Sequence, residues 1–232
     1  MATILETQSL TKKFGGFTAV DEVSFNVQQG EIRFLIGPNG AGKSTFFKLI
    51  IGNHEPNSGT ILFKNLNIEK LKIYERIKLG IGVKFQTPSV FSELTVLENL
   101  NLADNLNQLT NIENVLKDFS LVDEINILAG DLSHGKKQWL DIALATLSKP
   151  ELVFLDEPTA GLSFEETEKT SEIVKKLNKQ GITFVIVGHD MDFVKQTASK
   201  VSVLHLGKIF FEGSVSEVLS NKGVNDIYLG IS

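Results

Sequence analysis

The chain has 232 residues, of which 42% are apolar and 22% charged, so it is long enough to bury a large core and has the composition of an ordinary globular protein. Because it contains no cysteine, a disulfide framework, a thiolate zinc site and a cysteine nucleophile are excluded. The net charge of −5 argues against a nucleic-acid binder whose affinity rests on neutralising phosphates. No run of about 18 apolar residues occurs, and no basic stretch leads into an apolar one near the first residues, so we expect no transmembrane helix and no signal peptide.

The first quarter of the chain is predicted to be mostly strands around one helix. Apolar and polar residues are arranged as in strands over 4–7 and 23–27, and a nearly continuous apolar run covers 32–36. A glycine-rich loop follows this run. It leads into a helix predicted over 43–51, and a further short strand is predicted over 60–63.

The middle of the chain changes character, because residues from about 95 to 147 carry apolar side chains at helical spacing. After Pro150 strands and helices alternate again. The predicted strands are 152–155, 182–187, 201–205 and 209–212, the last two as a hairpin across 206–208, and the predicted helices are 165–178 and 191–198. This alternation, with near-continuous apolar strands, predicts an α/β fold whose mostly parallel sheet is covered on both faces, with the helical middle as an insertion.

A P-loop pattern joins the apolar run at 32–36 to the helix after it. The pattern requires two glycines, a lysine and a hydroxyl residue at fixed offsets. Glycines let the backbone curl so that successive N–H groups point at phosphate oxygens, while Lys43 can reach the β- and γ-phosphates and Ser44 can bind Mg²⁺. The residues predicted to bind the nucleotide here are Gly37, Pro38, Asn39, Gly40, Ala41, Gly42, Lys43, Ser44 and Thr45.

Two carboxylates, Asp156 and Glu157, follow directly after the apolar strand at 152–155. Ligands bind at the carboxyl edge of the sheet in α/β folds, so Asp156 is predicted to hold Mg²⁺ opposite Ser44. Glu157 is predicted to orient or deprotonate the attacking water. The alternative, two acids that only solvate a strand end, is much weaker beside a P-loop.

His189 follows the predicted strand at 182–187 in the same manner. We interpret it as a sensor of the γ-phosphate, because a histidine can donate a hydrogen bond to a phosphoryl oxygen. A lone histidine at a strand end is more often only a polar terminus, but the P-loop elsewhere in the chain favours the functional interpretation.

The stretch Leu132–Gln138 opens the helix that carries Trp139. Ser133 is a candidate N-cap, whose hydroxyl satisfies unpaired N–H groups of the first turn. A capped helix N-terminus with a glycine beside it is also a place where anions bind, so the structural and functional interpretations are compatible.

In this order, the motifs resemble those of the nucleotide-binding subunit of ABC transporters, and the resemblance covers essentially the whole chain. The segments that carry it are the P-loop at 37–45, Gln86, 132–138, 152–158, 160–163 and His189. The resemblance implies a P-loop NTPase fold with a mostly parallel core sheet and an N-terminal antiparallel β subdomain. It implies a single domain over 1–232, with a helical signature subdomain at about 87–148 inserted in the nucleotide-binding core.

Such a subunit binds ATP and Mg²⁺, hydrolyses ATP, and forms a head-to-tail dimer with a second copy or a paralogue. Each ATP then lies between the P-loop of one chain and the signature of the other, which implies that Ser133 and Gly135 contact the γ-phosphate held by the partner. Gln86 is implied to bind Mg²⁺ or water and to couple the site to a membrane subunit, which docks on the helical insert. Phe14 is implied to stack on adenine with Val20 beside it, the alternative for Phe14 being a core aromatic. The implied catalytic set is Lys43, Gln86, Glu157 and His189.

Some stretches resemble the branch of the family that takes up branched-chain amino acids and urea. The ending Ile227–Gly230 is similar to that branch, and residues 82–91 and 132–135 resemble its urea-type ATPase more closely. We therefore expect import of urea through separate membrane permease subunits, fed by a solute-binding protein, with branched-chain amino acids as the alternative solute. The expected place is the cytoplasmic face of the inner or plasma membrane, as a peripheral subunit that is soluble when isolated and has no nucleic-acid partner.

Four positions depart from the broad family pattern. Phe14 replaces the usual tyrosine and keeps its stacking face. His134 stands where glycine is usual and Lys136 where glutamine is usual, so only their backbone N–H groups are expected to contact phosphate. Ser163 occupies the place of a common aspartate, and it also begins a capping box with Glu166, so a structural role competes there.

Two other functions stay open at this point. A soluble ATPase of the same fold acting on nucleic acid or ribosomes fits less well, because the charge is acidic and the nucleotide domain is single and uninterrupted. A GTPase or small-molecule kinase also fits less well. The stretch 178–181 has Asn and Lys but lacks the aspartate of a guanine-reading motif, and a kinase does not explain the signature helix.

Overall fold

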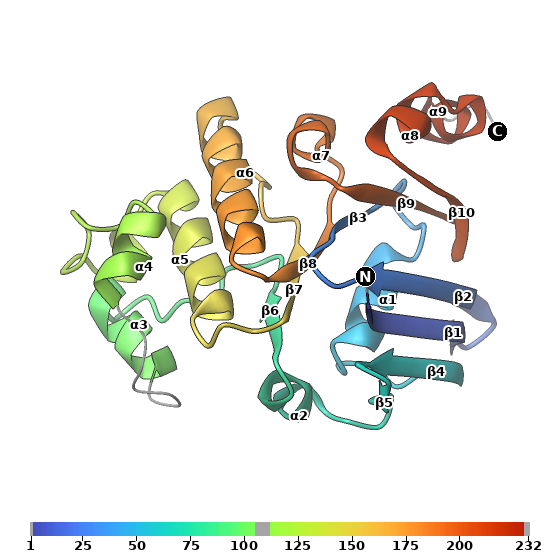
Figure 1. The fold of residues 1–232 in the computed structure, drawn as a ribbon, viewed down its shortest axis with the longest axis horizontal. Coiled ribbons are helices and arrows are strands. Elements are labelled where there is room, and N and C mark those ends of the chain that lie inside the picture. Colours follow the sequence, from blue (N-terminus) through green and yellow to red (C-terminus); the bar gives the residue numbers. More distant parts are fainter. Residues whose placement is uncertain (1, 105–111, 230–232) are drawn as a thin grey trace.

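The structure is a computed structural model that describes residues 2–104 and 112–229. Residues 105–111 of the predicted helical insert, and Gly230 of the chain ending, lie outside the described residues. Figure 1 shows the described elements running from a group of helices at one end, through a central sheet, to a second sheet and the C-terminal helices at the other end.

One sheet is antiparallel and has the strand order β2-β1-β4-β5. Its strands are β1 (Thr3–Phe14), β2 (Phe17–Gln28), β4 (Ser58–Phe63) and β5 (Leu66–Asn67). Strands β1 and β2 extend well beyond the predicted ranges 4–7 and 23–27, because shifts in their pairing register absorb residues that break the alternation. Ser9, with a φ of 47°, lies at one such shift. The predicted N-terminal antiparallel sheet is confirmed.

The second sheet has the order β10-β9-β3-β8-β7-β6. Its strands are β3 (Ile32–Ile36), β6 (Ile81–Lys84), β7 (Leu152–Asp156), β8 (Thr183–Val187), β9 (Lys200–His205) and β10 (Lys208–Gly213). The pairs from β6 through to β9 are parallel, and β10 pairs antiparallel with β9 as the predicted hairpin. The mostly parallel core sheet of the predicted fold is therefore confirmed. Strand β6 has no counterpart among the predicted strands, because Gly82 and Lys84 interrupt its apolar pattern.

In the described part of the stretch between β6 and β7, where helical spacing is predicted, the structure has three α-helices and a short 3-10 helix at Ala129–Asp131. The α-helices are α3 (Val96–Asp104), α4 (Ile112–Asp118) and α5 (His134–Thr146). The other helices are α1 (Lys43–Ile50), α2 (Ile73–Lys78), α6 (Phe164–Lys179), α7 (Met191–Thr197), α8 (Val215–Ser220) and α9 (Lys222–Leu229). Helices α1, α6 and α7 agree with the predicted ranges to within one residue at each end. Helices α2, α8 and α9 do not appear among the predictions, because one or two turns contain too few apolar positions to establish a period.

The central sheet is buried on both faces. In β3, the side chains of Ile32, Phe34 and Ile36 join an apolar cluster that includes residues of α5, α6 and α7. Leu35 joins a second cluster, which contains α1 and the antiparallel sheet. Since successive strand residues point to opposite faces, a strand buried on both sides is apolar at nearly every position.

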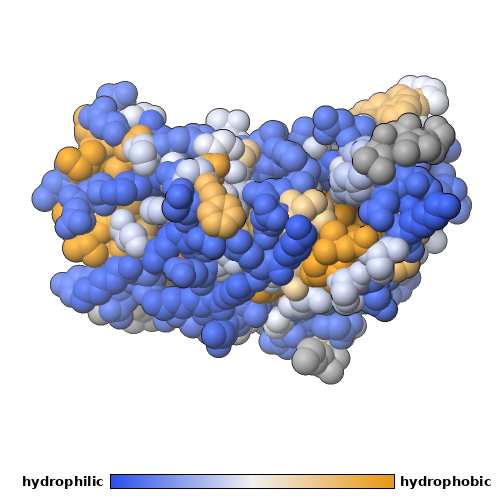
Figure 2. All heavy atoms as spheres, turned by 90° about the horizontal axis from the view of Figure 1, so that it is seen from above, coloured by the Kyte–Doolittle hydropathy of each residue, from blue (hydrophilic) through white to orange (hydrophobic). Residues whose placement is uncertain are grey.

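The outer surface is mostly polar. Within the described ranges, none of the helices combines the length and the apolar character that crossing a membrane requires. The face in Figure 2 is largely hydrophilic, with hydrophobic atoms gathered in a hollow right of centre and at the left end, where Figure 1 places α3, α4 and α5. Between the start of α3 and the end of α5, the described residues with exposed large hydrophobic side chains are Leu102, Val122, Ile127 and Leu128.

Candidate active site

The P-loop residues lie between the end of β3 and the start of α1, as predicted. Gly37 and Gly42 have positive φ values of 150° and 104°. A Cβ at Gly37 would lie 2.1 Å from the backbone oxygen of Leu204, and a Cβ at Gly42 would lie 2.3 Å from that of Ala19. Only glycine fits these two positions, because backbone atoms that close cannot give way to a side chain.

The first turn of α1 presents a suitable anion site. Gly42 is the N-cap and has no side chain to cap the helix, and no acidic residue occupies the first turn. A helix N-terminus after a glycine-rich loop favours phosphate through its N–H groups and its dipole. Of the other loop residues, Asn39, Gly40 and Ser44 are exposed, Pro38 and Thr45 are half-buried, and Ala41 is buried.

Lys43 is buried, and its ammonium group points back into the loop. Its Nζ donates hydrogen bonds to the backbone oxygens of Gly37 at 2.6 Å and Pro38 at 3.0 Å. Burial lowers the pKa of Lys43, while the negative charges of Glu157 and Asp156 act in the opposite direction. The loop lysine and the two carboxylates are therefore close enough to interact electrostatically.

The two carboxylates occupy the carboxyl end of β7, as predicted. Asp156 is the last residue of the strand and is buried; burial, and then the charge of Glu157, raise its pKa. Glu157 has a φ of 46°, and its N–H donates to the backbone oxygen of Val187 at 2.8 Å. This bond holds the left-handed residue against the end of the neighbouring strand β8.

Gln86, Glu157 and His189 come together at this edge of the sheet. Gln86 Nε2 donates to Glu157 Oε2 at 3.0 Å, and His189 Nδ1 lies 3.5 Å from Glu157 Oε1. A cavity of about 300 Å³ opens beside them, lined by Glu157, Thr159, Ala160, Gly161, Gly188, His189 and Asp190. Three residues that are far apart in the sequence thus share one small chemical site.

The donor set fits a magnesium ion that is shared with phosphate oxygens. The described residues contain no group of three or more His, Asp and Glu side chains arranged to hold a metal by themselves. Mg²⁺ is typically bound by one or two protein groups together with substrate phosphates. Burial, and then the charge of Glu157, raise the pKa of Asp156, and a divalent cation bound here would offset both effects. Ser44, which is exposed in the first turn of α1, would supply a hydroxyl ligand.

The signature residues lie elsewhere in the molecule. Ser133 is the N-cap of α5 and accepts a hydrogen bond from the Lys136 N–H at 3.3 Å, as the N-cap interpretation predicts. Gly135 is buried, and Ser133 is exposed. In Figure 1 the helix α5 lies well apart from α1 and the loop before it, so one chain does not bring its signature to its own P-loop.

The two residues predicted to contact adenine differ in exposure. Phe14 is 46% exposed, its ring centroid lies 5.6 Å from that of His54 in an edge-on contact, and Lys12 Nζ lies 5.3 Å from it. The Phe14 ring is therefore on the surface and not in the core. Val20 is fully buried in the apolar cluster around α1, so its predicted contact with adenine stays a prediction.

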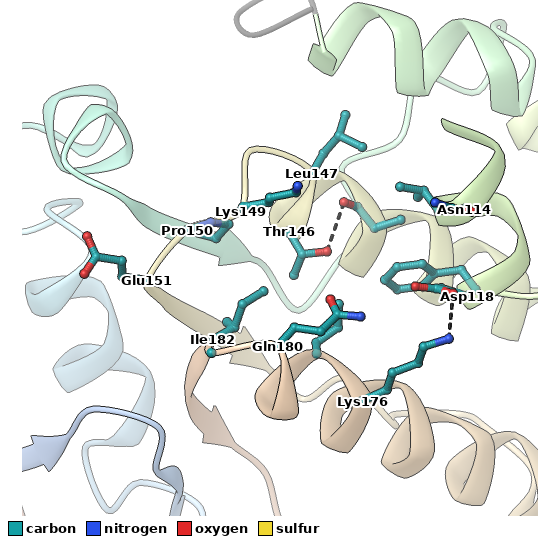
Figure 3. A pocket seen from close by; sticks show the side chains of 15 residues that line it. Asn114, Asp118, Thr146, Leu147, Lys149, Pro150, Glu151, Lys176, Gln180 and Ile182 are labelled. Atoms are coloured by element: carbon teal, nitrogen blue, oxygen red, sulfur yellow. Dashed lines mark hydrogen bonds and ion pairs between the residues drawn. The ribbon is translucent and has the colours of Figure 1, made fainter. Parts of the chain in front are cut away.

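A larger cavity of about 690 Å³ lies away from the P-loop and the carboxylates, at the end of the sheet where β7 and β8 begin. Figure 3 shows its side chains coming from α4, α5 and α6, with the ion pair between Lys176 and Asp118, 2.6 Å long, at one side. It is lined by Glu151 and Ile182, which precede β7 and β8, whereas Asp156 and His189 follow these strands. The smaller cavity, and not this one, therefore belongs with the predicted chemistry.

Two buried charges near the site escape sequence analysis. Lys84 is fully buried, its Nζ donates to the Asp156 backbone oxygen at 3.3 Å, and burial lowers its pKa to about 8. Burial raises the pKa of Asp141 to about 6, and its Oδ1 accepts the Ser89 N–H at 3.1 Å. The signal in the sequence is a charged residue inside an otherwise apolar stretch, as at Lys84 in strand β6.

The chain matches known proteins along most of its length. A family model described as ABC transporter matches residues 20–160. The lipopolysaccharide export system ATP-binding protein LptB of Acidithiobacillus ferridurans is 30% identical, over 99% of this chain and 98% of that protein. The high-affinity branched-chain amino acid transport ATP-binding protein LivG of Salmonella typhimurium is 31% identical, over 98% of each chain.

Solved structures agree with these matches. The ADP conformation of MJ1267, an ATP-binding cassette of an ABC transporter, superposes with a TM-score of 0.90 at 31% identity, over 99% of this chain and 100% of that one. A dimeric, post-hydrolysis structure of the ATP-binding cassette MJ0796 bound to ADP and phosphate gives a TM-score of 0.80 at 28% identity, over 91% of this chain and 98% of that one.

Proposed function

Because this chain belongs to the ABC transporter family, it is an ATPase that binds ATP with Mg²⁺ and couples hydrolysis to transport, and we propose that Glu157 is the centre of its hydrolytic site. The observation that carries the proposal is the contact of Glu157 with both Gln86 and His189, at a sheet edge near enough for its charge to act on Lys43. The site thereby combines a base, two hydrogen-bonding groups and a phosphate-binding lysine.

Each group has a separate task in this proposal. The backbone N–H groups of the P-loop and Lys43 bind the phosphates, and His189 donates a hydrogen bond to the γ-phosphoryl oxygen. Glu157 accepts a hydrogen bond from the attacking water and takes up its proton as the γ-phosphoryl group leaves ADP. Ser44, Asp156 and Gln86 hold Mg²⁺, which when bound neutralises charge on the phosphate oxygens.

The working unit in this proposal is a head-to-tail dimer with a second copy or a paralogue. The supporting observation is that the first turn of α5, with Ser133 and Gly135, is remote from the P-loop of the same chain in Figure 1. A capped helix N-terminus with an adjoining glycine suits a phosphate, so the signature of one chain serves the ATP of the other. The solved structure of MJ0796 with ADP and phosphate is dimeric, which supports a dimer as the working unit.

The membrane subunits dock on the helical insert in this proposal, the helical signature subdomain at about 87–148 within a single domain over 1–232. Five large hydrophobic side chains in the described part of the segment are between 40% and 57% exposed, namely Phe91, Leu102, Val122, Ile127 and Leu128. Exposed apolar groups gathered on one segment are typical of an interaction surface. The chain is then a peripheral protein on the cytoplasmic face of the membrane, soluble when isolated.

The solute in this proposal is urea, taken up through separate permease subunits and delivered by a solute-binding protein. Support comes from residues 82–91 and 132–135, which resemble the urea-type ATPases of the family. Branched-chain amino acids are the second candidate, because LivG, whose name states that transport, is 31% identical over nearly the whole chain.

Reconstitution tests the solute and the coupling together. The chain is co-expressed with the permease subunits encoded beside it, purified as a complex and placed in vesicles with the neighbouring solute-binding protein. We expect urea to raise ATP hydrolysis several-fold and leucine to leave it unchanged. Stimulation by leucine alone supports the second candidate, and failure to co-purify with any membrane subunit contradicts the proposed role in import.

A further inference from the structure

The histidine of the signature is tied to the loop that follows the catalytic strand. His134 is the first residue of α5, and its Nε2 lies 2.9 Å from the backbone oxygen of Ala160. The side-chain amide of Gln138 lies 3.4 Å from the same ring nitrogen. A carbonyl oxygen can only accept, so the hydrogen bond to Ala160 forms in the tautomer that carries the proton on Nε2. A glycine, which is usual at this position in the broad family, has no side chain to make this bond.

The next residue of the loop leaves room for the ring. Gly161 has a φ of 75°, and a Cβ built on it would lie 3.2 Å from Nε2 of His134 and 3.4 Å from its Cδ2. Any side chain at this position would press against the imidazole. The ring of His134 therefore lies directly over the backbone of the loop.

A second contact joins the same two segments. Glu166, in the first turn of α6, accepts the Ser163 N–H at 2.9 Å through Oε2 as part of a capping box. Its carboxylate packs so closely on Gly135 that a Cβ there would lie 2.2 Å from Oε1. The loop at 160–163 is thus attached to the first turn of α5 near both of its ends, an arrangement we call the signature brace (His134, Gly135, Ala160, Gly161, Ser163 and Glu166).

The other side of this loop faces the hydrolytic site. Thr159, Ala160 and Gly161 line the same 300 Å³ cavity as Glu157 and His189. The signature brace therefore joins the signature to residues that line the cavity beside Glu157 of the same chain. Only Pro158 and Thr159 separate Glu157 from Ala160 in the sequence.

We infer that His134 is a positioning residue that links the two ATP sites of the dimer. The signature of each chain serves the partner's ATP. Through the hydrogen bond of His134, a displacement of the signature also displaces the loop beside Glu157 of the same chain. This inference rests on the proposed head-to-tail arrangement and on the proposed role of Glu157. Its content is that one side-chain hydrogen bond, which a glycine at this position cannot make, connects the signature to the loop beside Glu157.

A mixed dimer tests the link. One chain carries Glu157→Gln, so ATP is hydrolysed at the P-loop of the other chain, and the signature that serves this ATP comes from the first chain. His134→Ala is then added to the hydrolysing chain, whose own signature does not touch the ATP being hydrolysed. We expect kcat to fall about 2- to 10-fold, the value of one hydrogen bond, with the KM for ATP unchanged.

Two further variants separate positioning from general damage. His134→Gln keeps an N–H donor of similar reach and should restore most of the rate. His205→Ala removes a histidine of β9 that contacts Phe210 and lies outside the signature brace, and should leave kcat unchanged. All variants are compared by thermal unfolding, and where the mixed dimer turns over only once, the rate of that single turnover is measured in place of kcat.

The inference is overturned if His134→Ala in the hydrolysing chain leaves the rate unchanged, or if His134→Gln lowers it as much as alanine does. Failure of the proposed function would be seen in a different measurement. A dimer with Glu157→Gln in both chains that hydrolyses ATP at the wild-type rate contradicts the role of Glu157, and it is seen with no change at His134.

Discussion

The side-chain amide of Gln86 donates a hydrogen bond of 3.0 Å to Glu157, although 71 positions separate the two residues in the chain. The second oxygen of the carboxylate lies 3.5 Å from His189 Nδ1. Both oxygens of Glu157 therefore have a neighbour from another strand end, and the protein's own side chains set the orientation of the group. A base held in this manner loses little conformational freedom when it meets a water molecule.

Replacing this carboxylate should separate binding from hydrolysis. In Glu157→Gln, the side chain keeps its size but cannot take up a proton, so we expect ATP affinity within a few-fold of wild type and kcat at least about 100-fold lower. The ATP-bound dimer should accumulate and be visible by size-exclusion chromatography. Glu165→Gln, on the exposed first turn of α6, is the matched control and should hydrolyse ATP normally. A wild-type rate of ATP hydrolysis in Glu157→Gln would contradict the assignment of Glu157 as the base.

The shared site can be tested by moving one substitution between the chains of a mixed dimer. One chain again carries Glu157→Gln, and the partner hydrolyses ATP. Ser133→Ala in the first chain should lower this hydrolysis at least about 10-fold, because it removes a hydroxyl that hydrogen-bonds to a charged phosphate. Ser133→Ala in the hydrolysing chain should have little effect. The opposite pattern, measured by steady-state phosphate release, would show that each chain uses its own signature.

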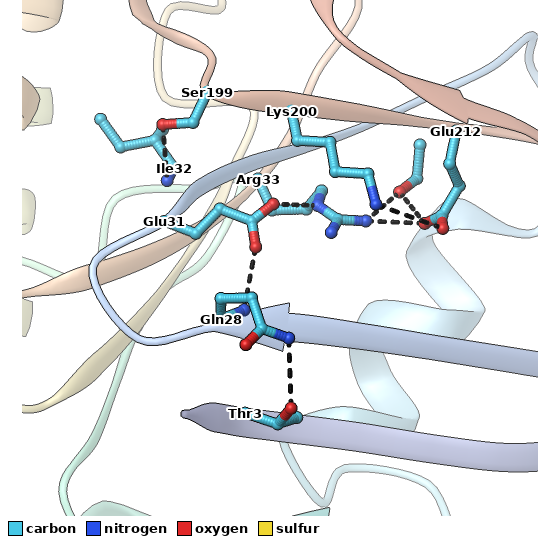
Figure 4. A network of polar contacts seen from close by, with 9 residues as sticks. Thr3, Gln28, Glu31, Ile32, Arg33, Ser199, Lys200 and Glu212 are labelled. Carbon is cyan, nitrogen blue, oxygen red and sulfur yellow. Dashed lines mark hydrogen bonds and ion pairs between the residues drawn. The ribbon is translucent and has the colours of Figure 1, made fainter. Parts of the chain in front are cut away.

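The buried Arg33 of β3 binds to the hairpin of β9 and β10, which forms one side of the central sheet. Arg33 is 1% exposed; its Nε lies 2.6 Å from Glu31 and its Nη1 2.6 Å from Glu212. Figure 4 shows Arg33 of β3 between Glu212 of β10 and Glu31. Ser202 of β9 accepts a further hydrogen bond from Nη1 at 2.8 Å. The guanidinium also lies 5.2 Å from the ring centroid of Phe25.

Removing this cation should destabilise the fold strongly. Arg33→Met keeps the aliphatic bulk but removes the cation beside Glu31, and among the described residues it leaves Glu212 with only Lys200, whose Nζ lies 3.8 Å from Oε2. We expect the free energy of unfolding to fall by about 3 to 5 kcal/mol, measured by urea denaturation. Lys195→Met removes an exposed partner of Asp192, at 3.3 Å, and should cost less than about 1 kcal/mol. Equal losses for the two variants would contradict the buried network.

Asp141 should give the stability a specific dependence on pH. Its pKa rises from 3.8 to about 6, chiefly because burial disfavours the charged carboxylate. Between these two values the folded chain binds more protons at this site than the unfolded chain, so the contribution is lost as the pH rises towards 6. In Asp141→Asn this loss is absent. We expect the stability of the variant, relative to wild type, to increase by on the order of 2 to 3 kcal/mol between pH 4 and pH 6.

Urea denaturation at several pH values between 4 and 7 measures this difference directly. Asp123→Asn, a substitution of an exposed carboxylate in the same helical segment, is the control and should follow the wild-type curve. Curves for Asp141→Asn and wild type that stay parallel across the window would contradict the raised pKa.

The residues that could be predicted from the sequence are those whose signal is local. The P-loop motif, the carboxylates at the end of β7 and the N-cap at Ser133 each occupy a short stretch with its own physical reason, and the structure has them on the expected elements. The helices α1, α6 and α7 belong to the same group, because their apolar period is long enough to see.

The remainder depends on contacts between distant segments. The need for glycine at Gly37 arises from the backbone of Leu204, which no local pattern announces. Asp141 is buried in α5, where its carboxylate accepts the N–H of Ser89 from a distant loop. The hydrogen bond of His134 to Ala160 requires that α5 and the loop after β7 are placed first. Such features follow from the folded arrangement and not from any window of sequence.

The P-loop is hydrogen-bonded to the turn at Gly207, which is translated much later than the loop itself. The Gly207 N–H donates to the Ala41 oxygen at 2.9 Å, and the Gly207 oxygen accepts the Asp21 N–H at the same distance. Synthesis proceeds at about 5 to 20 residues per second, so roughly 10 to 30 seconds pass between translation of the motif and translation of this turn. During that interval a nascent chain contains the whole nucleotide-binding motif without the support that holds its shape. The loop can therefore reach the hydrogen-bonded arrangement that it has in the folded chain only near the end of translation.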